Sequence, residues 1–174
     1  MFVENVGQFD SKARFQVRGA NGTIFLAPNE MWITLVEPVP LSDKTKRFDS
    51  DELKKPSKGV NVRLSFVGAN PNPKVEGFDP VDSKTSYFIG NDPAKWKGNV
   101  PTYSGVRYVD LYSGVDLEIT SEKGKWVWRF VANDSSRLAD VKLKVDGQDR
   151  MRIENEHLNL TTSIGDLLLP MINA

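Results

Sequence analysis

The sequence contains no cysteine and a single histidine, His157. The absence of cysteine excludes disulfide bonds, thiolate metal ligands and a cysteine nucleophile. A Ser-His-Asp site would have to use His157, and no Gly-x-Ser-x-Gly segment accompanies it. A catalytic zinc ion normally takes two or three histidine or cysteine ligands, so zinc catalysis is disfavoured as well. His157 lies in an alternating segment, which predicts a solvent-facing side chain on a strand.

The chain also lacks a net charge and a long apolar run. Of its 174 residues, 23 are Lys or Arg and 23 are Asp or Glu, so the formal net charge is zero. A neutral chain has no overall electrostatic attraction to nucleic acid or to an anionic membrane, although local patches remain open. No apolar run approaches the roughly 20 residues that span a bilayer. The content of 39% hydrophobic and 26% charged residues is typical of a soluble globular protein.

A phosphate-binding Gly-x-x-x-x-Gly-Lys-Ser/Thr segment and an alternation of strands with helices are both missing, which argues against a nucleotide site. What is present is a series of short strand patterns separated by turn residues. Asn21-Gly22 and Pro28-Asn29 predict tight turns between the first strands. We predict strands at residues 14–18, 23–26, 31–36, 60–67, 106–111, 115–120, 126–132, 141–145, 151–153, 157–161 and 166–169.

These patterns predict an all-β domain, an antiparallel β-sandwich-like fold with little helix beyond one short turn at residues 133–139. We expect a single domain over residues 1–174, with a flexible charged loop at about 38–59. Met1 stands directly before FVENVGQ, and we expect it to replace a removed leader. The apolar end LLLPMINA indicates a domain truncated at its C-terminal end.

Residues 75–118 form a long stretch that is rich in Tyr, Gly, Pro and Asp and has no clear period until near its end. Long uncommitted loops are rare in compact domains, so we predict a long ordered loop. Its acidic residues Asp79, Asp82 and Asp92 make a calcium site a candidate, because calcium prefers oxygen ligands in loops. The segment does not match an EF-hand, and ordinary surface carboxylates are the alternative.

Asp116 and Glu118 are two residues apart on the polar face of a predicted strand, roughly 7 Å from each other. That separation fits a glycosidase pair or a cation site, and it fits equally a solvated sheet face. The four tryptophans are candidate platforms for stacking sugar rings: Trp32, Trp96, Trp126 and Trp128.

Trp126 and Trp128 share one strand face, which predicts that both lie in the core. Trp96 lies between Lys95 and Lys97 and is the best candidate for an exposed ring. The candidate ligand-binding set is Trp96, Tyr103, Tyr108 and Asp92, with packing over the long loop as the alternative for the aromatic side chains.

Several segments resemble one bacterial family. FVENVGQ at residues 2–8 is similar to the FVENxGQ opening of a cell-surface domain found N-terminal to SBBP-type β-propeller repeats, and residues 62–73 resemble its RLxFxGANPxP segment. YFIGNDPAKW at residues 87–96 resembles its NYFIGNDPxKW motif, and residues 99–118 resemble its VPTYxxVxYxxLYPGVDLxY run. Ser113 departs from the usual Pro and Ile119 from the usual aromatic residue. The family also continues into further β structure after the segment that matches residues 162–165.

The resemblance implies an exported bacterial protein, extracellular or at the cell surface, and carries no activity because the family is a domain of unknown function. The leading hypothesis is a non-catalytic module for adhesion, scaffolding or carbohydrate contact. It would need no cofactor, with calcium as the candidate exception. Its partners would be downstream domains of the same polypeptide and polysaccharide or a cell-surface glycan, not nucleic acid. The alternatives are a structural cap on the downstream propeller repeats and a carbohydrate-active enzyme that uses carboxylates.

Overall fold

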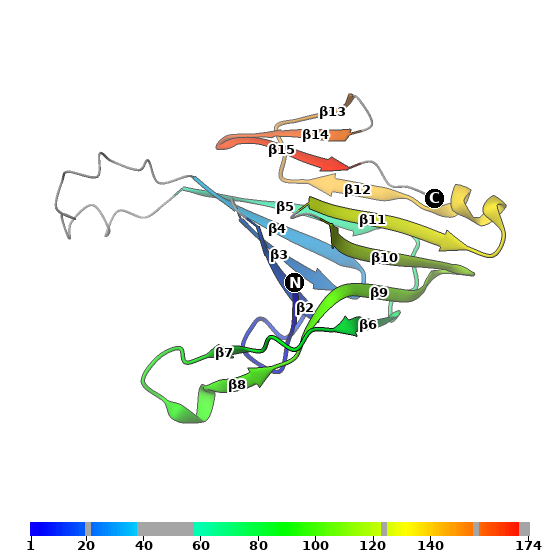
Figure 1. Cartoon of the computed structure of the whole chain (residues 1–174). Coiled ribbons are helices and arrows are strands. Elements are labelled where there is room, and N and C mark those ends of the chain that lie inside the picture. Colours follow the sequence, from blue (N-terminus) through cyan, green and yellow to red (C-terminus); the bar gives the residue numbers. More distant parts are fainter. Residues whose placement is uncertain (20–21, 38–57, 123–124, 155–156, 171–174) are drawn as a thin grey trace.

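The computed structural model describes residues 1–19, 22–37, 58–122, 125–154 and 157–170, and it consists largely of antiparallel strands (Figure 1). Its helical elements within these residues are two short 3-10 helices, η2 (Pro93–Lys95) and η3 (Ser135–Asp140). No helix in the described part combines the length and the apolar character needed to cross a membrane. The all-β architecture predicted from the sequence is confirmed.

The largest sheet of the described residues contains ten strands. Nine follow the order β11-β10-β9-β1-β2-β3-β4-β5-β12, and β6 pairs with β9 beside this path. The strands are β1 (Phe2–Glu4), β2 (Phe15–Gly19), β3 (Gly22–Ala27), β4 (Glu30–Val36), β5 (Gly59–Phe66), β6 (Lys74–Pro80), β9 (Thr102–Tyr112), β10 (Val115–Glu122), β11 (Lys125–Ala132) and β12 (Leu143–Asp146).

Tight hairpins build the first half of this sheet, as the turn residues predict. Strands β2 and β3 are in register with Gly19 opposite Gly22, although the turn at residues 20–21 lies outside the described residues. Strands β3 and β4 are joined at Pro28-Asn29, with Ala27 opposite Glu30. The predicted charged loop at 38–59 falls almost entirely on residues 38–57, which also lie outside the described part.

One strand of three residues connects the two halves of the sheet. In β1, Phe2 pairs with Val17 of β2 on one side and with Tyr103 of β9 on the other. Phe2 is itself fully buried. Strand β1 therefore joins the β2–β5 meander to the strands β9, β10 and β11.

The large sheet curls (Figure 1). Its inward side chains form one core. Ile24, Met31 and Ile33 of β3 and β4 lie around the same small cavity as Ile119 and Trp128 of β10 and β11. A three-stranded sheet, β13 (Arg150–Glu154), β14 (His157–Thr162) and β15 (Gly165–Pro170), adds apolar side chains to this core. Each fully buried aliphatic or aromatic side chain contributes about 1.5–3 kcal/mol.

The stretch at 75–118 is ordered, but it is mostly strand rather than a long loop. Besides β6 and β9, it contains the hairpin strands β7 (Thr85–Tyr87) and β8 (Lys97–Val100). Aromatic rings cover glycines where β6 meets β9: the ring of Phe78 lies over Gly105, and that of Tyr103 lies over Gly77. This long-range packing favours strands where the local sequence, with its Gly and Pro, does not.

The segment 85–100, which we call the arm, holds β7, η2 and β8 and projects away from the large sheet (Figure 1). Its base is fixed to the body by a small apolar cluster of Val3, Tyr87 and Val100, against which Phe9 packs. The arm therefore leaves the domain from an anchored root.

Candidate functional site

An open groove of about 570 Å³ lies along β3, β4 and β5 and takes in the end of β12. We call it the Trp32 groove. Pockets that bind small ligands typically fall between about 300 and 1,000 Å³. Among the residues that line it are Phe9, Asp10, Lys12, Phe25, Trp32, Thr34, Asn61, Arg63 and Asp146.

Strand alternation explains why these side chains lie together. In β3 and β4, Ile24 and Ile33 point into the core, so Phe25 and Trp32 point to the opposite face. The two-residue turn at 28–29 fixes the register in which Phe25 is directly opposite Trp32. On the next strand, Arg63 is opposite Trp32. Two aromatic rings and a guanidinium group therefore share one row across three strands.

Polar contacts orient the groove side chains. The Trp32 Nε1–H donates to Glu30 Oε1 at 2.9 Å, and Arg63 Nε lies 3.5 Å from Glu30 Oε2. The Thr34 hydroxyl donates to Asn61 Oδ1 at 2.8 Å. These contacts hold the indole edge and leave its ring half-buried in the groove wall.

The loop after β1 supplies Phe9, and Asn5 shapes this loop. Asn5 Nδ2 donates to the carbonyl oxygens of Asp10 and Ala13, both at 2.8 Å, and its Oδ1 accepts from the backbone N–H of Gly7 and Phe9. Gly7 has φ +104°, a conformation that favours glycine. The FVENVGQ segment thus builds the turn that brings Phe9 to the groove.

Phe9 also joins the groove to the arm. Its ring packs edge-to-face on Phe25 at 5.8 Å and on Tyr87 at 5.2 Å. Burial raises the pKa of the Tyr87 hydroxyl, although Arg18 opposes the effect. The groove wall and the root of the arm are thus parts of one packed unit.

The residues predicted to bind a ligand do not form a single site. Trp96 and Asp92 lie on the arm. Tyr103 packs against Phe15 at 5.9 Å and donates from its hydroxyl to Glu4 Oε2 at 3.1 Å. Burial, followed by the contact with Glu4, raises the Tyr103 pKa. Tyr108 is fully buried in the core, so its side chain cannot meet a ligand at the surface.

The three acidic residues proposed to bind calcium also do not form one site. Asp92 caps η2, accepting from the Ala94 N–H at 3.1 Å, and lies 3.8 Å from Lys95 Nζ. Asp79 and Asp82 are exposed. Among the described residues, no group of three or more His, Cys, Asp or Glu side chains is arranged to hold a metal ion.

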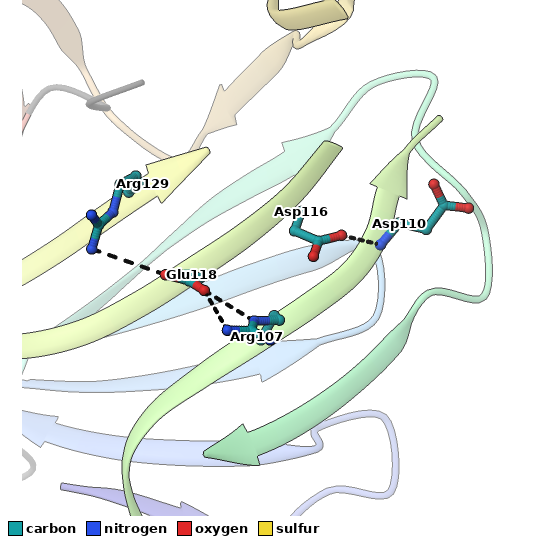
Figure 2. A network of polar contacts seen from close by, with 5 residues as sticks. All are labelled: Arg107, Asp110, Asp116, Glu118 and Arg129. Carbon is teal, nitrogen blue, oxygen red and sulfur yellow. Dashed lines mark hydrogen bonds and ion pairs between the residues drawn. The ribbon is translucent and has the colours of Figure 1, made fainter. Parts of the chain in front are cut away.

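The carboxylates of β10 belong to a network of protein contacts, shown in Figure 2. Asp116 Oδ1 accepts from the backbone N–H of Asp110 at 2.7 Å, where β9 is irregular and Asp110 has φ +52°. Glu118 Oε1 accepts from Arg107 Nη2 at 2.6 Å, and its Oε2 lies 4.0 Å from Arg129 Nη2. Asp116 therefore stabilises a bulge, and Glu118 forms ion pairs with arginines on the two neighbouring strands.

The predictions for the remaining candidates agree with the structure. His157 is exposed on β14. Trp128 is buried in the core, and Trp126 packs against the same core. Of the four tryptophans, the two with ring surface away from the core are Trp32 in the groove and Trp96 on the arm.

Local sequence patterns do not identify Phe9, Phe25, Asn61, Arg63 or Asp146 as site residues. Two signals could have found part of this set. The Pro28-Asn29 turn determines which residues face each other across β3 and β4, and alternation assigns Phe25 and Trp32 to the face opposite Ile24 and Ile33.

The family described as a domain of unknown function (DUF7948) matches residues 2–170 of this chain. No curated protein matches the chain, and no solved structure does.

Proposed function

The chain belongs to the DUF7948 family of domains of unknown function, and we propose that it is a non-catalytic extracellular module that contacts carbohydrate through the Trp32 groove. The observation that carries the proposal is the row of Phe25, Trp32 and Arg63 across an open groove. The extracellular setting rests on the resemblance of the sequence to exported bacterial domains.

The groove has the two kinds of groups that a sugar needs. The apolar face of a pyranose ring stacks on an aromatic ring, and Trp32 offers a half-buried one between Phe25 and Arg63. Sugar hydroxyls need donors and acceptors, which Asn61 and Asp146 provide among the side chains that line the groove. The arrangement combines an apolar floor with a few polar groups, as ligand sites commonly do.

The groove is also held in shape by the fold. Gly147, at φ +95°, lies against the backbone oxygen of Asn61, which places Asp146 beside β5. Trp32 is tethered to Glu30, as described above. Preorganised side chains lose little conformational entropy on binding, which favours affinity from a small contact area.

The contacts of the β10 carboxylates support binding rather than hydrolysis. Glu118 is engaged by Arg107 and Arg129, and Asp116 is committed to the bulge in β9. A glycosidase carboxylate must be free to contact the scissile bond, whereas both of these carboxylates are engaged by other groups of the protein. The double variant D116N/E118Q should therefore leave glycan binding unchanged, and a loss of measurable hydrolysis in that variant would revive the enzyme hypothesis.

The proposal is tested by a panel of polysaccharides, followed by calorimetry on any that bind. Trp32→Ala should weaken binding at least tenfold while the thermal unfolding curve keeps its shape. Trp96→Ala is the matched control, because it removes the other accessible indole and leaves the groove intact. Equal affinity for Trp32→Ala and the natural protein, or no binding across the panel, would refute the carbohydrate function.

One observation favours a structural cap as a second candidate. The small sheet carries exposed apolar side chains at Met151, Ile153 and Leu168, and β13 is its edge strand. Unpaired apolar edges readily take up another strand or surface. If the domain caps downstream repeats, amide hydrogens of β13 should exchange much more slowly when those repeats are attached. Unchanged exchange would count against this candidate.

A further inference from the structure

The far end of the arm exposes large apolar side chains. Phe88 is 65% exposed, Ile89 67% and Trp96 42%, and we call these three residues the arm tip. The rings of Phe88 and Trp96 pack edge-to-face at 5.5 Å, so they form one patch. Figure 1 shows that β7, η2 and β8 carry this end away from the body. Contiguous apolar groups on a projecting element mark a contact surface.

Hydrogen bonds within the arm hold the arm tip in a defined conformation. The Trp96 indole N–H donates to the Gly90 carbonyl at 3.1 Å, and Asp92 caps the 3-10 turn between them. Lower in the arm, Ser86 Oγ accepts from the Asn99 N–H at 3.2 Å. The root is fixed by Tyr87 and Val100. The apolar side chains are therefore presented by an ordered stem, and their exposure is a property of the folded state.

The charges around the arm tip are predominantly positive. Residues 84–97 contain Lys84, Lys95 and Lys97 and a single acidic residue, Asp92, which gives this segment a net charge of +2 in a chain of net charge zero. Within the described part of the chain, Asp92 is near Lys95, and neither Lys84 nor Lys97 forms an ion pair. The arm tip is thus apolar at its end and has lysines behind it.

We propose that the arm tip inserts into the interface of an anionic lipid bilayer. Tryptophan favours the level of the lipid headgroups, and Phe and Ile favour the acyl region just below. Lysines behind the apolar groups would lie among the headgroups, where each contributes about a fivefold gain in affinity for an anionic surface. The net charge of +2 on residues 84–97 favours an anionic bilayer over an uncharged apolar surface. The proposal concerns the arm and does not rest on the carbohydrate function of the groove.

Co-sedimentation with vesicles tests the proposal. The protein should bind vesicles of phosphatidylglycerol and phosphatidylcholine more tightly than vesicles of phosphatidylcholine alone, and binding should weaken as salt rises. Ile89→Asp should lower binding at least tenfold. Leu168→Asp is the matched control, because Leu168 is equally exposed, at 62%, and lies on the small sheet. It should bind as the natural protein does.

Tryptophan fluorescence gives an independent readout. Insertion should shift the emission of Trp96 to shorter wavelength on addition of anionic vesicles, and Trp96→Phe should abolish the shift. The proposal is overturned if neither kind of vesicle binds, which would instead favour a protein partner for the arm tip. It is equally overturned if both kinds bind alike, or if Ile89→Asp and Leu168→Asp have the same effect.

Discussion

The most informative test of the core concerns Tyr108, the largest fully buried side chain. Its ring packs edge-to-face on Phe66 at 5.6 Å, but its hydroxyl oxygen is buried without a hydrogen-bond partner among the described residues. Burying a hydroxyl without a partner costs about 1–3 kcal/mol. Tyr108→Phe keeps the ring and removes this cost, so we expect the variant to be more stable by about 1 kcal/mol.

Tyr112, four residues along the same strand, is the matched control. Its hydroxyl donates to the Lys142 carbonyl at 2.9 Å and accepts from the Lys142 N–H at 3.3 Å. Tyr112→Phe removes the same atom but breaks these bonds, so stability should fall by about 1 kcal/mol. In a protein of this size, each kcal/mol shifts Tm by about 2–4 °C. Urea denaturation and calorimetry should give shifts of opposite sign for the two variants.

The pH dependence of stability supplies a second measurement on Tyr108. Burial raises the pKa of its hydroxyl far above the ordinary value of 10.0. Above pH 10 the unfolded chain loses this proton while the folded protein keeps it, so the free energy of unfolding declines as pH rises. The decline from this group approaches about 1.4 kcal/mol per pH unit. Tyr108→Phe lacks this contribution, so its advantage over the natural protein should be larger at pH 11 than at pH 7.

Two results would refute this reasoning. If Tyr108→Phe is less stable than the natural protein at pH 7, the hydroxyl has a favourable partner in solution, such as a buried water molecule. If both proteins lose stability equally between pH 10 and pH 11, the phenol is not held protonated by the core.

Two further pairs of variants test the packing of β9 and the network in Figure 2. A Cβ at Gly105 would overlap the ring of Phe78, whereas a Cβ at Gly98 meets nothing within 4 Å. Gly105→Ala should therefore cost about 1–3 kcal/mol in urea denaturation and Gly98→Ala less than about 0.5 kcal/mol; similar values would contradict the packing. Glu118 is only 18% exposed between its two arginines, while Glu154 is 54% exposed and pairs with one arginine at 3.7 Å. Glu118→Gln should cost about 1 kcal/mol and Glu154→Gln close to nothing at low salt, and equal costs would show that the network adds no stability.

Local patterns were sufficient to predict most of the fold. Alternation located the strands around Phe15, Val62 and Trp128, and the Pro28-Asn29 turn matches the hairpin between β3 and β4. Asp134 caps the short helix predicted near it. These features depend on residues close together in the sequence, so they can be predicted from local sequence patterns.

The rest depends on contacts between distant residues. Strand β6 contains Gly77 and ends at Pro80, and both residues locally favour a loop. It forms a strand because the ring of Phe78 packs over Gly105 of β9 and the ring of Tyr103 of β9 packs over Gly77. The groove likewise combines Phe9 from a loop, Trp32 from β4 and Asp146 from β12. Trp32 was recognised as a possible sugar platform, but its neighbours follow from strand register and loop path, which local periodicity does not give.

The position of β1 has a consequence for the order of folding. The β2–β5 meander and the β9–β11 strands each form from neighbours in sequence, but Phe2 completes its pairing only when Tyr103 is in place. Such distant closure is slow, because a long chain must be organised first. Until then, β2 and the short stretch Thr102–Tyr103 of β9 lack a partner strand on the side that β1 occupies. The three residues Phe2–Glu4 therefore complete the large sheet late, by pairing with β2 and β9.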